Sequence, residues 1–336
     1  MNRPQHSVIV PAYNAERTIG ACVAALCAQS FDQPYEIIVI DDGSTDGTAV
    51  VARAAGARVI ITPNGRPAAA RNAGLRAASG EIICCTDADC IPHADWLQHI
   101  TAPFADTDIA ACKGSYATQQ TELVARFVQL EYEDKYDLLR SENYIDFIDT
   151  YSAAYRRKVL LECGGFDERF DYLEDQELSF RLAAQGRKMV FQPAAVVEHL
   201  HSASLRAYLS KKQTIGYWKA QVVRRFPERA VKDSHTPQVM KAQMLLSLML
   251  ISLALVGLAG IVFGPDDWHI SGRLYLLPAT IVGLVFLITT LPFVRKAWPK
   301  DRAAALISPG LLLGRALALS AGYARGMLRP QRLETD

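Results

Sequence analysis

The sequence predicts an α/β domain with a mostly parallel central sheet, followed by C-terminal transmembrane helices. Two observations carry this prediction. Over roughly the first quarter of the chain, short β-branched runs alternate with alanine-rich segments of helix length, as in parallel sheets that helices cover on both faces. Near the C-terminus, residues 243–263 and 274–294 form two uncharged apolar runs, each long enough to cross a bilayer as a helix. We therefore expect two domains, residues 1–235 and 236–336.

The expected strands and helices follow one another along the chain. The β-branched runs predict strands at residues 6–13, 35–43, 57–62 and 81–89. The segments between them predict helices at residues 18–29, 45–55 and 67–78. Further helices are expected at residues 122–139, 156–163, 174–184 and 205–226. Because ligands of parallel sheets bind outside the carboxyl ends of the strands, we expect a site where these strands end.

Composition and charge narrow the class of protein. The chain has 36 basic and 35 acidic residues, and this balance argues against nucleic-acid binding, which usually needs a basic excess. The 7 cysteines show neither a disulfide pattern nor a four-ligand zinc spacing, so reduced thiols are expected. The start of the chain lacks a sustained apolar stretch, which predicts no cleavable signal peptide.

The charges that flank the two apolar runs predict their orientation. Basic residues precede the first run and follow the second, whereas Arg273 is the only basic residue between them. The positive-inside rule therefore places residues 1–235 on the cytoplasmic side of an inner or plasma membrane. The alternative is a pair of buried helices in a soluble core, although such helices are usually shorter. A third apolar stretch, residues 303–324, is interrupted by Pro309 and Arg315, which favours an interfacial or re-entrant segment.

Acidic residues follow the second and fourth predicted strands. Asp41 and Asp42 end one strand, and Asp87 and Asp89 end the other. Like charges this close need a positive partner, and carboxylate oxygens suit a hard cation such as Mg²⁺ or Mn²⁺. A solvated acidic turn is the alternative. The residue types at 43–48 are typical of a turn. A turn alone does not explain the adjacent acids Asp41 and Asp42, so we expect Asp42 to bind the base or the ribose of a nucleotide.

Six short motifs occur in a fixed order between residue 7 and about residue 235. They are VPAYN at 10–14, IDDGSTDGT at 40–48, ARNAG at 70–74, TDAD at 86–89, GGFDE at 164–168 and ED at 174–175. Each motif is loose by itself, whereas the ordered set is specific. In this set the chain resembles the family 2 glycosyltransferases, which have the GT-A fold. The resemblance implies an enzyme that moves a sugar from a nucleotide-sugar donor, most commonly a UDP-sugar.

The resemblance also implies roles for individual residues on the donor side. The residues expected to bind the nucleotide sugar are Pro11, Tyr13, Asp41, Asp42, Arg71 and Asp87. For Arg71 a solvated helix face is an equal alternative. Asp89 would bind Mg²⁺ or Mn²⁺, because the departing nucleoside diphosphate gains a negative charge that a cation neutralises.

The acceptor side needs a base, because an unassisted hydroxyl group is a weak nucleophile. By resemblance this base is Asp175, with Glu174 as its neighbour, although acids in a first helical turn also complement the helix dipole. One carboxylate that acts opposite the nucleotide implies inversion at the anomeric carbon. The resemblance makes His199 the further metal ligand and His201 the second choice. Polar histidines on a solvated strand edge are the alternative.

Departures from the family pattern restrict the function. Processive members carry Gln-X-X-Arg-Trp, but residues 213–218 lack that arginine and that spacing. Two or three membrane segments are also too few for an obvious polymer channel. We therefore expect a distributive enzyme that adds one sugar to a lipid-linked or glycan acceptor. Membrane anchoring suits a lipid-linked acceptor, because enzyme and substrate then share one surface.

Two other functions compete with this interpretation. A sugar-nucleotide nucleotidyltransferase would need a glycine-rich phosphate loop after the first strand, where this chain has residues 11–14, Pro-Ala-Tyr-Asn. A non-catalytic membrane scaffold that keeps the fold would have no need of Asp87, Asp89 and Asp175 together. Both alternatives are less consistent with the sequence than glycosyl transfer.

Overall fold

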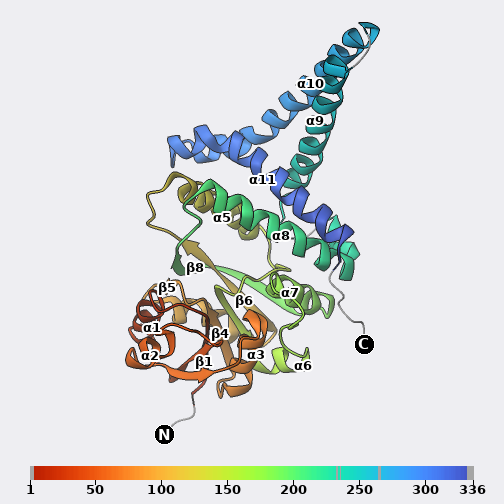
Figure 1. Cartoon of the computed structure of the whole chain (residues 1–336). Helices are drawn as coiled ribbons and strands as arrows, with labels where there is room; N and C mark the ends of the chain where they lie inside the picture. The colour runs from red at the N-terminus through yellow and green to blue at the C-terminus, as the bar shows by residue number, and fades with distance from the viewer. Residues whose placement is uncertain (1–3, 232–233, 235, 264–265, 331–336) are drawn as a thin grey trace.

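In the computed structural model, long C-terminal helices follow an α/β domain, and part of this helical region projects away from the domain (Figure 1). The structure describes residues 4–231, 234, 236–263 and 266–330. Two sequence predictions fall partly outside these ranges. The start of the chain, for which no cleavable signal peptide is expected, includes residues 1–3, and the expected domain boundary includes residue 235. The predicted α/β class with a mostly parallel sheet is confirmed.

In the described residues, one eight-stranded sheet forms the centre of the α/β domain. Its strands are β1 (His6–Ala12), β2 (Tyr35–Asp41), β3 (Arg58–Ile61), β4 (Ile82–Thr86), β5 (Cys90–Pro92), β6 (Ile109–Ala117), β7 (Ser152–Arg156) and β8 (Lys188–His199). Their order is β3-β2-β1-β4-β7-β6-β8-β5. The half formed by β3, β2, β1 and β4 is parallel, and β8 is parallel to β6. β7 is antiparallel to both neighbours, as β5 is to β8.

Helices flank this sheet, and all of them except a short helix at residues 96–101 match predicted helices, with small shifts at their ends. They are α1 (Ile19–Cys27), α2 (Thr48–Ala54), α3 (Arg66–Ala77), α4 (Trp96–Thr101), α5 (Leu123–Arg140), α6 (Arg157–Glu162), α7 (Glu174–Ala184) and α8 (Leu205–Arg225), with 3₁₀ turns η1 (Ala102–Ala105) and η2 (Pro227–Ala230). α2 begins later than expected because residues 43–47 form a turn, in which the Asp46 carboxylate accepts a hydrogen bond from the Thr48 N–H at 3.0 Å.

The apolar strands are buried on both faces, as their continuous β-branched sequences predict. Val8, Ile9 and Val10 of β1 and residues 38–40 of β2 are at most 1% exposed. α3 packs directly on these strands through Gly74. A Cβ atom added at Gly74 would lie 2.5 Å from Ile9 Cγ2, so only glycine allows this approach. The ARNAG motif therefore ends on a residue that sets the distance between helix and sheet.

Strands β6 and β7 lie at the centre of the sheet, yet the sequence pattern does not predict them. The reason is their composition: β6 contains Lys113, Gly114 and Ser115, and β7 is rich in small residues. Lys113 is buried because it forms an ion pair with Asp149 and lies 5.0 Å from the centroid of the Phe147 ring. A polar residue with a buried partner interrupts the apolar run that identifies a central strand.

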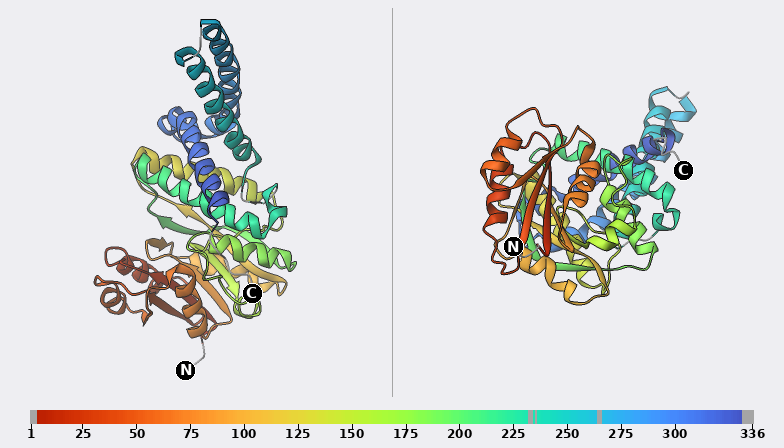
Figure 2. Two further views of the ribbon diagram at one scale, coloured as in Figure 1. Left: turned by 45° about the vertical axis from the view of Figure 1, so that its right-hand side comes forward. Right: turned by 90° about the horizontal axis from the view of Figure 1, so that it is seen from below.

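The C-terminal region contains α9 (Gln238–Phe263), α10 (Asp266–Ala297) and α11 (Arg302–Leu328). By length and composition these 3 helices of the described chain could each cross a membrane. α9 and α10 lie side by side and extend beyond the α/β domain (Figures 1 and 2). Only 11% of the apolar window of α9 is buried inside the protein. α10 begins within the expected connecting segment 264–273, of which residues 264 and 265 lie outside the described residues.

α11 is one continuous helix that includes Pro309. Arg315, at its centre, is buried: its Nη1 donates to Glu131 Oε1 of α5 and its Nη2 to Gln243 Oε1 of α9, both at 2.7 Å. α11 lies along α8 and also contacts α5, so half of its apolar window is buried, 50%. The arginine is thus compensated within the protein.

Three glycines bring the backbones of α8 and α11 into contact. Gly216 lies on α8, and Gly322 and Gly326 lie on α11. A Cβ atom added at Gly322 would collide with the backbone carbonyl of Gln213, and one at Gly216 would collide with that of Leu319. Small residues at such contacts allow close helix packing.

We predict that Gly322→Ala separates α8 from α11 and destabilises the protein. The added methyl group meets backbone atoms that cannot rotate away, and overpacking of this kind costs roughly 1–3 kcal/mol. The measurement is the thermal unfolding temperature of the purified protein, which should fall by several degrees.

The matched control is Gly310→Ala on the same helix, because no atom lies within 4 Å of a Cβ added there. This variant should unfold at or above the temperature of the unaltered protein, since alanine favours a helix over glycine. Equal unfolding temperatures for the two variants would contradict the close packing.

Candidate active site

A cleft of about 990 Å³ opens at the carboxyl ends of β1, β2 and β4 and continues toward α8 and the C-terminal helices. Nine residues expected to act in the site line it: Pro11, Tyr13, Asp42, Arg71, Asp87, Asp89, Glu174, Asp175 and His199. They come from both halves of the α/β domain. The strand ends and α7 thus meet at one cavity, as the sheet argument predicts.

The two acids at the end of β2 have different surroundings. Asp42 lines the cleft and accepts hydrogen bonds from the N–H groups of Gly65 and Arg66 at 2.9 and 2.8 Å. Asp41 is buried, accepts a hydrogen bond from the Ser44 N–H at 2.9 Å, and does not line the cleft formed by the described residues. Contrary to the expectation from the sequence, the structure keeps Asp41 away from the cavity, where it stabilises the turn after β2.

Arg71 is the buried cation of the site. Its Nη2 lies 2.9 Å from Asp87 Oδ1, and its Nη1 donates a short hydrogen bond to Glu174. Burial alone would lower the pKa of Arg71, but the charges of Glu174 and Asp87 outweigh it and raise that pKa. Arg71 is only 4% exposed, so the alternative of a solvated helix face is wrong. The arginine joins the end of β4 to the start of α7.

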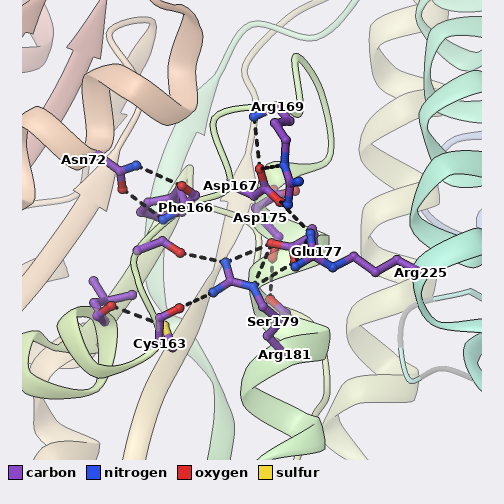
Figure 3. Close-up of polar contacts among 12 residues, drawn as sticks. Asn72, Cys163, Phe166, Asp167, Arg169, Asp175, Glu177, Ser179, Arg181 and Arg225 are labelled. Carbon is purple, nitrogen blue, oxygen red and sulfur yellow. Dashed lines mark hydrogen bonds and ion pairs between the residues drawn. The ribbon is translucent and has the colours of Figure 1, made fainter. Parts of the chain in front are cut away.

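Asn72, the next residue of α3, holds the loop that precedes α7 (Figure 3). Its Oδ1 accepts from the Phe166 N–H at 2.9 Å, and its Nδ2 donates to the Phe166 carbonyl at 2.8 Å. Gly165 has a positive φ of 73°, and a Cβ atom added there would lie 2.5 Å from Asn72 Oδ1. The ARNAG and GGFDE motifs are therefore two sides of one contact. The sequence marks both motifs but does not indicate that they touch.

A second ion-pair cluster fixes α7 (Figure 3). Arg181 donates to Glu177 Oε1 at 2.8 Å and to the Gly165 carbonyl at 2.6 Å. Arg225 of α8 lies 2.5 Å from Asp167 Oδ2 and 3.2 Å from Glu177 Oε1. Because Glu177 is fully buried, these contacts connect the first turns of α7 firmly to both the GGFDE loop and α8.

α7 begins at Glu174 and presents Asp175 to the cleft. Leu173, just before the helix, has a left-handed backbone with φ of 63°, which turns the chain sharply into α7. Burial, followed by the charge of Glu174, raises the pKa of Asp175 from its ordinary value of 3.8 to about 7. A carboxyl group with a pKa near neutrality is suited to accept a proton as a general base.

Asp89 and His199 face each other in another part of the cleft. His199 Nε2 lies 3.5 Å from Asp89 Oδ2. β5 pairs with β8 so that Cys90 lies opposite His199, and the ligand atoms of these three residues lie within 4.8 Å of one another. Burial, then the charges of Asp87 and Asp89, raise the pKa of the Cys90 thiol well above its ordinary value, so it stays protonated. Carboxylate oxygen and imidazole nitrogen remain, a donor set that fits Mn²⁺ or Mg²⁺.

His201 lies behind His199 and does not line the cleft formed by the described residues. Its Nδ1 is 3.2 Å from His199 Nδ1, and its Nε2 is 2.9 Å from Gln129 Oε1. Burial, then the neighbouring His199, lower the pKa of His201 to about 3, so the ring is neutral. Of the two histidines, His199 is thus the one placed to hold a cation, with His201 as the group that orients it.

The cleft also has a part that sequence analysis missed. Beyond Asp175 it is lined by Lys211, Ile215, Lys219 and Val223 of α8, Met240, Lys241 and Met244 of α9, and Leu319 and Tyr323 of α11. These residues come from three helices that are distant in sequence. The four-residue spacing of the α8 residues was the only available signal, and it is typical of any amphipathic helix.

Comparisons with known proteins agree with this geometry. Residues 7–164 match the family model of "Glycosyl transferase family 2". The chain is 26% identical to the "Pre-mycofactocin glycosyltransferase" of Mycobacterium tuberculosis, over 73% of this chain and 54% of that protein. It is 27% identical to the "O-antigen chain rhamnosyltransferase WbaN" of Salmonella anatum, over 65% of this chain and 73% of that protein. The chain thus spans about half the length of the mycobacterial relative, 54%.

A solved structure shares the fold over nearly the whole chain. It is the mannosyltransferase PcManGT of Pyrobaculum calidifontis in complex with GDP-Man and Mn²⁺, with a TM-score of 0.62 and 20% sequence identity. The superposition covers 98% of this chain and 89% of that one. Residues 7–164 are thus similar in sequence to glycosyltransferase family 2, and the α/β domain has a GT-A-like fold.

Proposed function

We propose that the protein is a metal-dependent, inverting glycosyltransferase. It would transfer one sugar from a nucleotide-sugar donor to a hydroxyl group of a lipid-linked or glycan acceptor at the cytoplasmic face of an inner or plasma membrane. The observation that carries this proposal is the composition of the cleft. Asp89 and His199, a carboxylate and an imidazole that could hold a cation, line the same cavity as Asp175, whose pKa is raised to about 7.

The donor would lie along the ends of β1, β2 and β4. This part of the cleft is lined by Pro11, Tyr13, Asp42 and Asp87. Tyr13 is 52% exposed, so its ring is accessible to the base of the nucleotide. Asp89 and His199 would hold Mn²⁺ or Mg²⁺, which would offset the charge of the departing diphosphate. The fold of the mannosyltransferase solved with GDP-Man and Mn²⁺ supports this assignment. Residues in this part of the cleft would bind, orient and release the nucleoside diphosphate.

The acceptor would enter from the side of α7. Its hydroxyl oxygen would attack the anomeric carbon while Asp175 takes the hydroxyl proton. The bond between the anomeric carbon and the diphosphate oxygen would break, and the nucleoside diphosphate would leave. Attack from the face opposite the diphosphate inverts the anomeric configuration. One carboxylate is enough for this displacement, and no covalent intermediate is required.

The membrane assignment is supported by the C-terminal helices. α9 and residues 276–297 of α10 have apolar windows with 11% and 22% of the residues buried, so most of their side chains need an apolar environment outside the described protein. The basic residues on either side of these two helices favour a cytoplasmic position for the α/β domain. α11, held against α5 and α8, would lie at the membrane interface.

We predict that Asp175→Asn lowers the turnover of nucleotide sugar about 100-fold or more, because general-base catalysis is lost. The affinity for nucleoside diphosphate and Mn²⁺ should stay within about twofold, since the cation site is made by other residues. The measurements are nucleoside diphosphate release and calorimetric binding.

The matched control is Asp32→Asn, which changes an exposed carboxylate outside the cleft. It should leave turnover and binding unaltered. Unreduced turnover in Asp175→Asn would refute the assignment of the base. Release of pyrophosphate in place of nucleoside diphosphate would instead indicate a nucleotidyltransferase.

The raised pKa of Asp175 predicts a pH dependence of both activity and stability. Activity should rise with pH through a midpoint near the folded-state pKa of about 7, because only the carboxylate accepts a proton. Stability should change in the opposite direction. Since the folded state binds the Asp175 proton more tightly than the unfolded state does, the contribution of this group declines as pH rises from the ordinary pKa of 3.8 to about 7.

Thermal unfolding against pH tests the second part of this prediction. Asp175→Asn should unfold at a higher temperature than the unaltered protein above neutral pH, and the difference should shrink as the solution is acidified. A difference that does not depend on pH would contradict a buried, titrating Asp175.

The cation site predicts that His199→Ala and Asp89→Asn each weaken Mn²⁺ binding about tenfold or more. Each change removes one of the few ligand atoms that the described chain offers there. Calorimetric titration of Mn²⁺ in the presence of nucleoside diphosphate measures the loss. The matched control is His99→Ala. His99 lies on α4 and pairs with Asp95, just before that helix, so this variant should bind Mn²⁺ normally. Normal binding by both site variants would argue against this pair as ligands.

A further inference from the structure

We propose that Gln129 of α5 is a positioning residue for the cation site. Acting through His201, it fixes the proton of the His199 ring on Nδ1 and leaves Nε2 as the ring nitrogen that can bind a divalent cation. This inference rests on the proposed function, because the cation site of Asp89 and His199 is part of it. Gln129 does not line the cleft formed by the described residues, so its effect on the site passes through other side chains.

The side-chain amide of Gln129 has one orientation that satisfies its neighbours. Its Nε2 donates to the Tyr116 carbonyl at 3.1 Å and lies 3.4 Å from Glu133 Oε1. A carbonyl and an ionised carboxylate can only accept hydrogen bonds, so the opposite orientation would set the amide oxygen against two acceptors. Gln129 Oε1 therefore faces His201 Nε2, at 2.9 Å.

This orientation decides which nitrogen of His201 carries the proton. Because an amide oxygen only accepts, the proton of that hydrogen bond has to sit on His201 Nε2. A second proton, on Nδ1, would charge a ring that is only 5% exposed and that lies beside a cation site, which is unfavourable. His201 Nδ1 is thus left with a lone pair.

The proton between the two histidine rings therefore belongs to His199. The two Nδ1 atoms are 3.2 Å apart, and one of them has to donate. His201 Nδ1 has no proton to give, so His199 Nδ1 is the donor, and in a neutral His199 ring Nε2 then carries the lone pair.

The spacing between His199 and Asp89 agrees with this assignment. His199 Nε2 lies 3.5 Å from Asp89 Oδ2. An ordinary N–H···O hydrogen bond is shorter, about 2.7–3.2 Å. The longer distance fits an imidazole nitrogen and a carboxylate oxygen that both offer electron pairs, and such a pair suits a divalent cation.

Two further contacts hold His201 so that it can transmit the orientation. The side chain of Gln120 accepts from the His201 N–H and donates to the His201 carbonyl at 3.2 Å. The Tyr132 ring of α5 stacks on the imidazole, with ring centroids 5.5 Å apart and an angle of 13° between the planes. Both the main chain and the ring of His201 are therefore fixed by residues of α5 and of the segment just before it.

The test uses the full chain, purified in a neutral detergent without metal, with ¹⁵N-labelled histidines in mildly alkaline buffer. Long-range ¹H–¹⁵N NMR spectra show which ring nitrogen bears the proton, and the loss of signals in His199→Ala identifies those of His199. We expect His199 to carry its proton on Nδ1. Gln129→Met removes the acceptor oxygen at similar size and should let His199 populate both proton positions. Gln129→Glu keeps an acceptor oxygen and should preserve the single form.

Calorimetric titration of Mn²⁺ in the presence of nucleoside diphosphate gives a second readout. We expect Gln129→Met to weaken Mn²⁺ binding about tenfold, as is typical when a group that orients a metal ligand is lost, and Gln129→Glu to stay within about threefold. The matched control is Gln98→Met, which changes an exposed glutamine of α4 outside the cleft. This control should bind Mn²⁺ as the unaltered protein does.

The NMR spectrum of the unaltered protein keeps the test decisive even if a variant fails to fold. A proton on Nε2 of His199 in that spectrum would overturn the inference. Unchanged Mn²⁺ affinity in Gln129→Met would overturn it as well. Thermal unfolding of each variant completes the comparison. If Gln129→Met and Gln129→Glu lose stability equally while the His199 proton stays on Nδ1, the role of Gln129 is structural and the inference fails.

Nucleotide-sugar turnover in the same preparations separates the two proposals. If nucleotide sugar is consumed but Gln129→Met alters neither the His199 proton nor the Mn²⁺ affinity, the positioning role fails while glycosyl transfer stands. If both readouts depend on Gln129 as expected but no nucleotide sugar is consumed, the proposed function fails while the positioning role stands.

Discussion

The need to keep several carboxylates in one cleft is the constraint on which the rest of the site depends. Asp87, Glu174 and Asp175 would repel one another if no cation were buried among them. Arg71 supplies that cation and pairs with Asp87 and Glu174, which leaves Asp175 without a direct ion pair among the residues that the structure describes. The pKa of Asp175 consequently rises through burial and the charge of Glu174. One arginine thus joins the two halves of the domain and leaves one carboxyl group able to act as a base.

A second buried network extends this rigidity to the long apolar C-terminal helices. Glu131 of α5 accepts from Arg315 of α11 at 2.7 Å and from the Tyr208 hydroxyl of α8 at 3.0 Å, and it lies 3.1 Å from Lys212 Nζ. Arg315 also donates to Gln243 of α9. Breaking such a buried pair leaves an uncompensated charge, which is strongly destabilising. The helices that would anchor the protein and the domain that would perform the chemistry are therefore one structural unit.

How far the sequence predicts this molecule depends on how local each signal is. The parallel half of the sheet follows from continuous apolar runs, and its strand ends locate Asp42, Asp87 and Asp89 without any knowledge of tertiary structure. β6 and β7 escape prediction because their polar residues find partners only after folding, as Lys113 does in Asp149. The burial and the ion pairs of Arg71 could not be predicted for the same reason, since its partners are distant in sequence. The lysine-lined end of the cleft is similarly invisible, because three separate helices build it.

Arg315 explains why hydropathy alone misrepresents α11. A charge at the centre of an apolar helix is costly in lipid, so such a residue needs a partner inside the protein. Here the partner is Glu131, which belongs to a helix of the α/β domain, and the pair fixes the middle of α11 to that domain. α11 therefore cannot follow α9 and α10 outward. It lies along α8 instead, and it contributes Leu319 and Tyr323 to the end of the cleft. The ion pair that holds α11 in place thereby also sets where the apolar end of the cleft lies relative to Asp175.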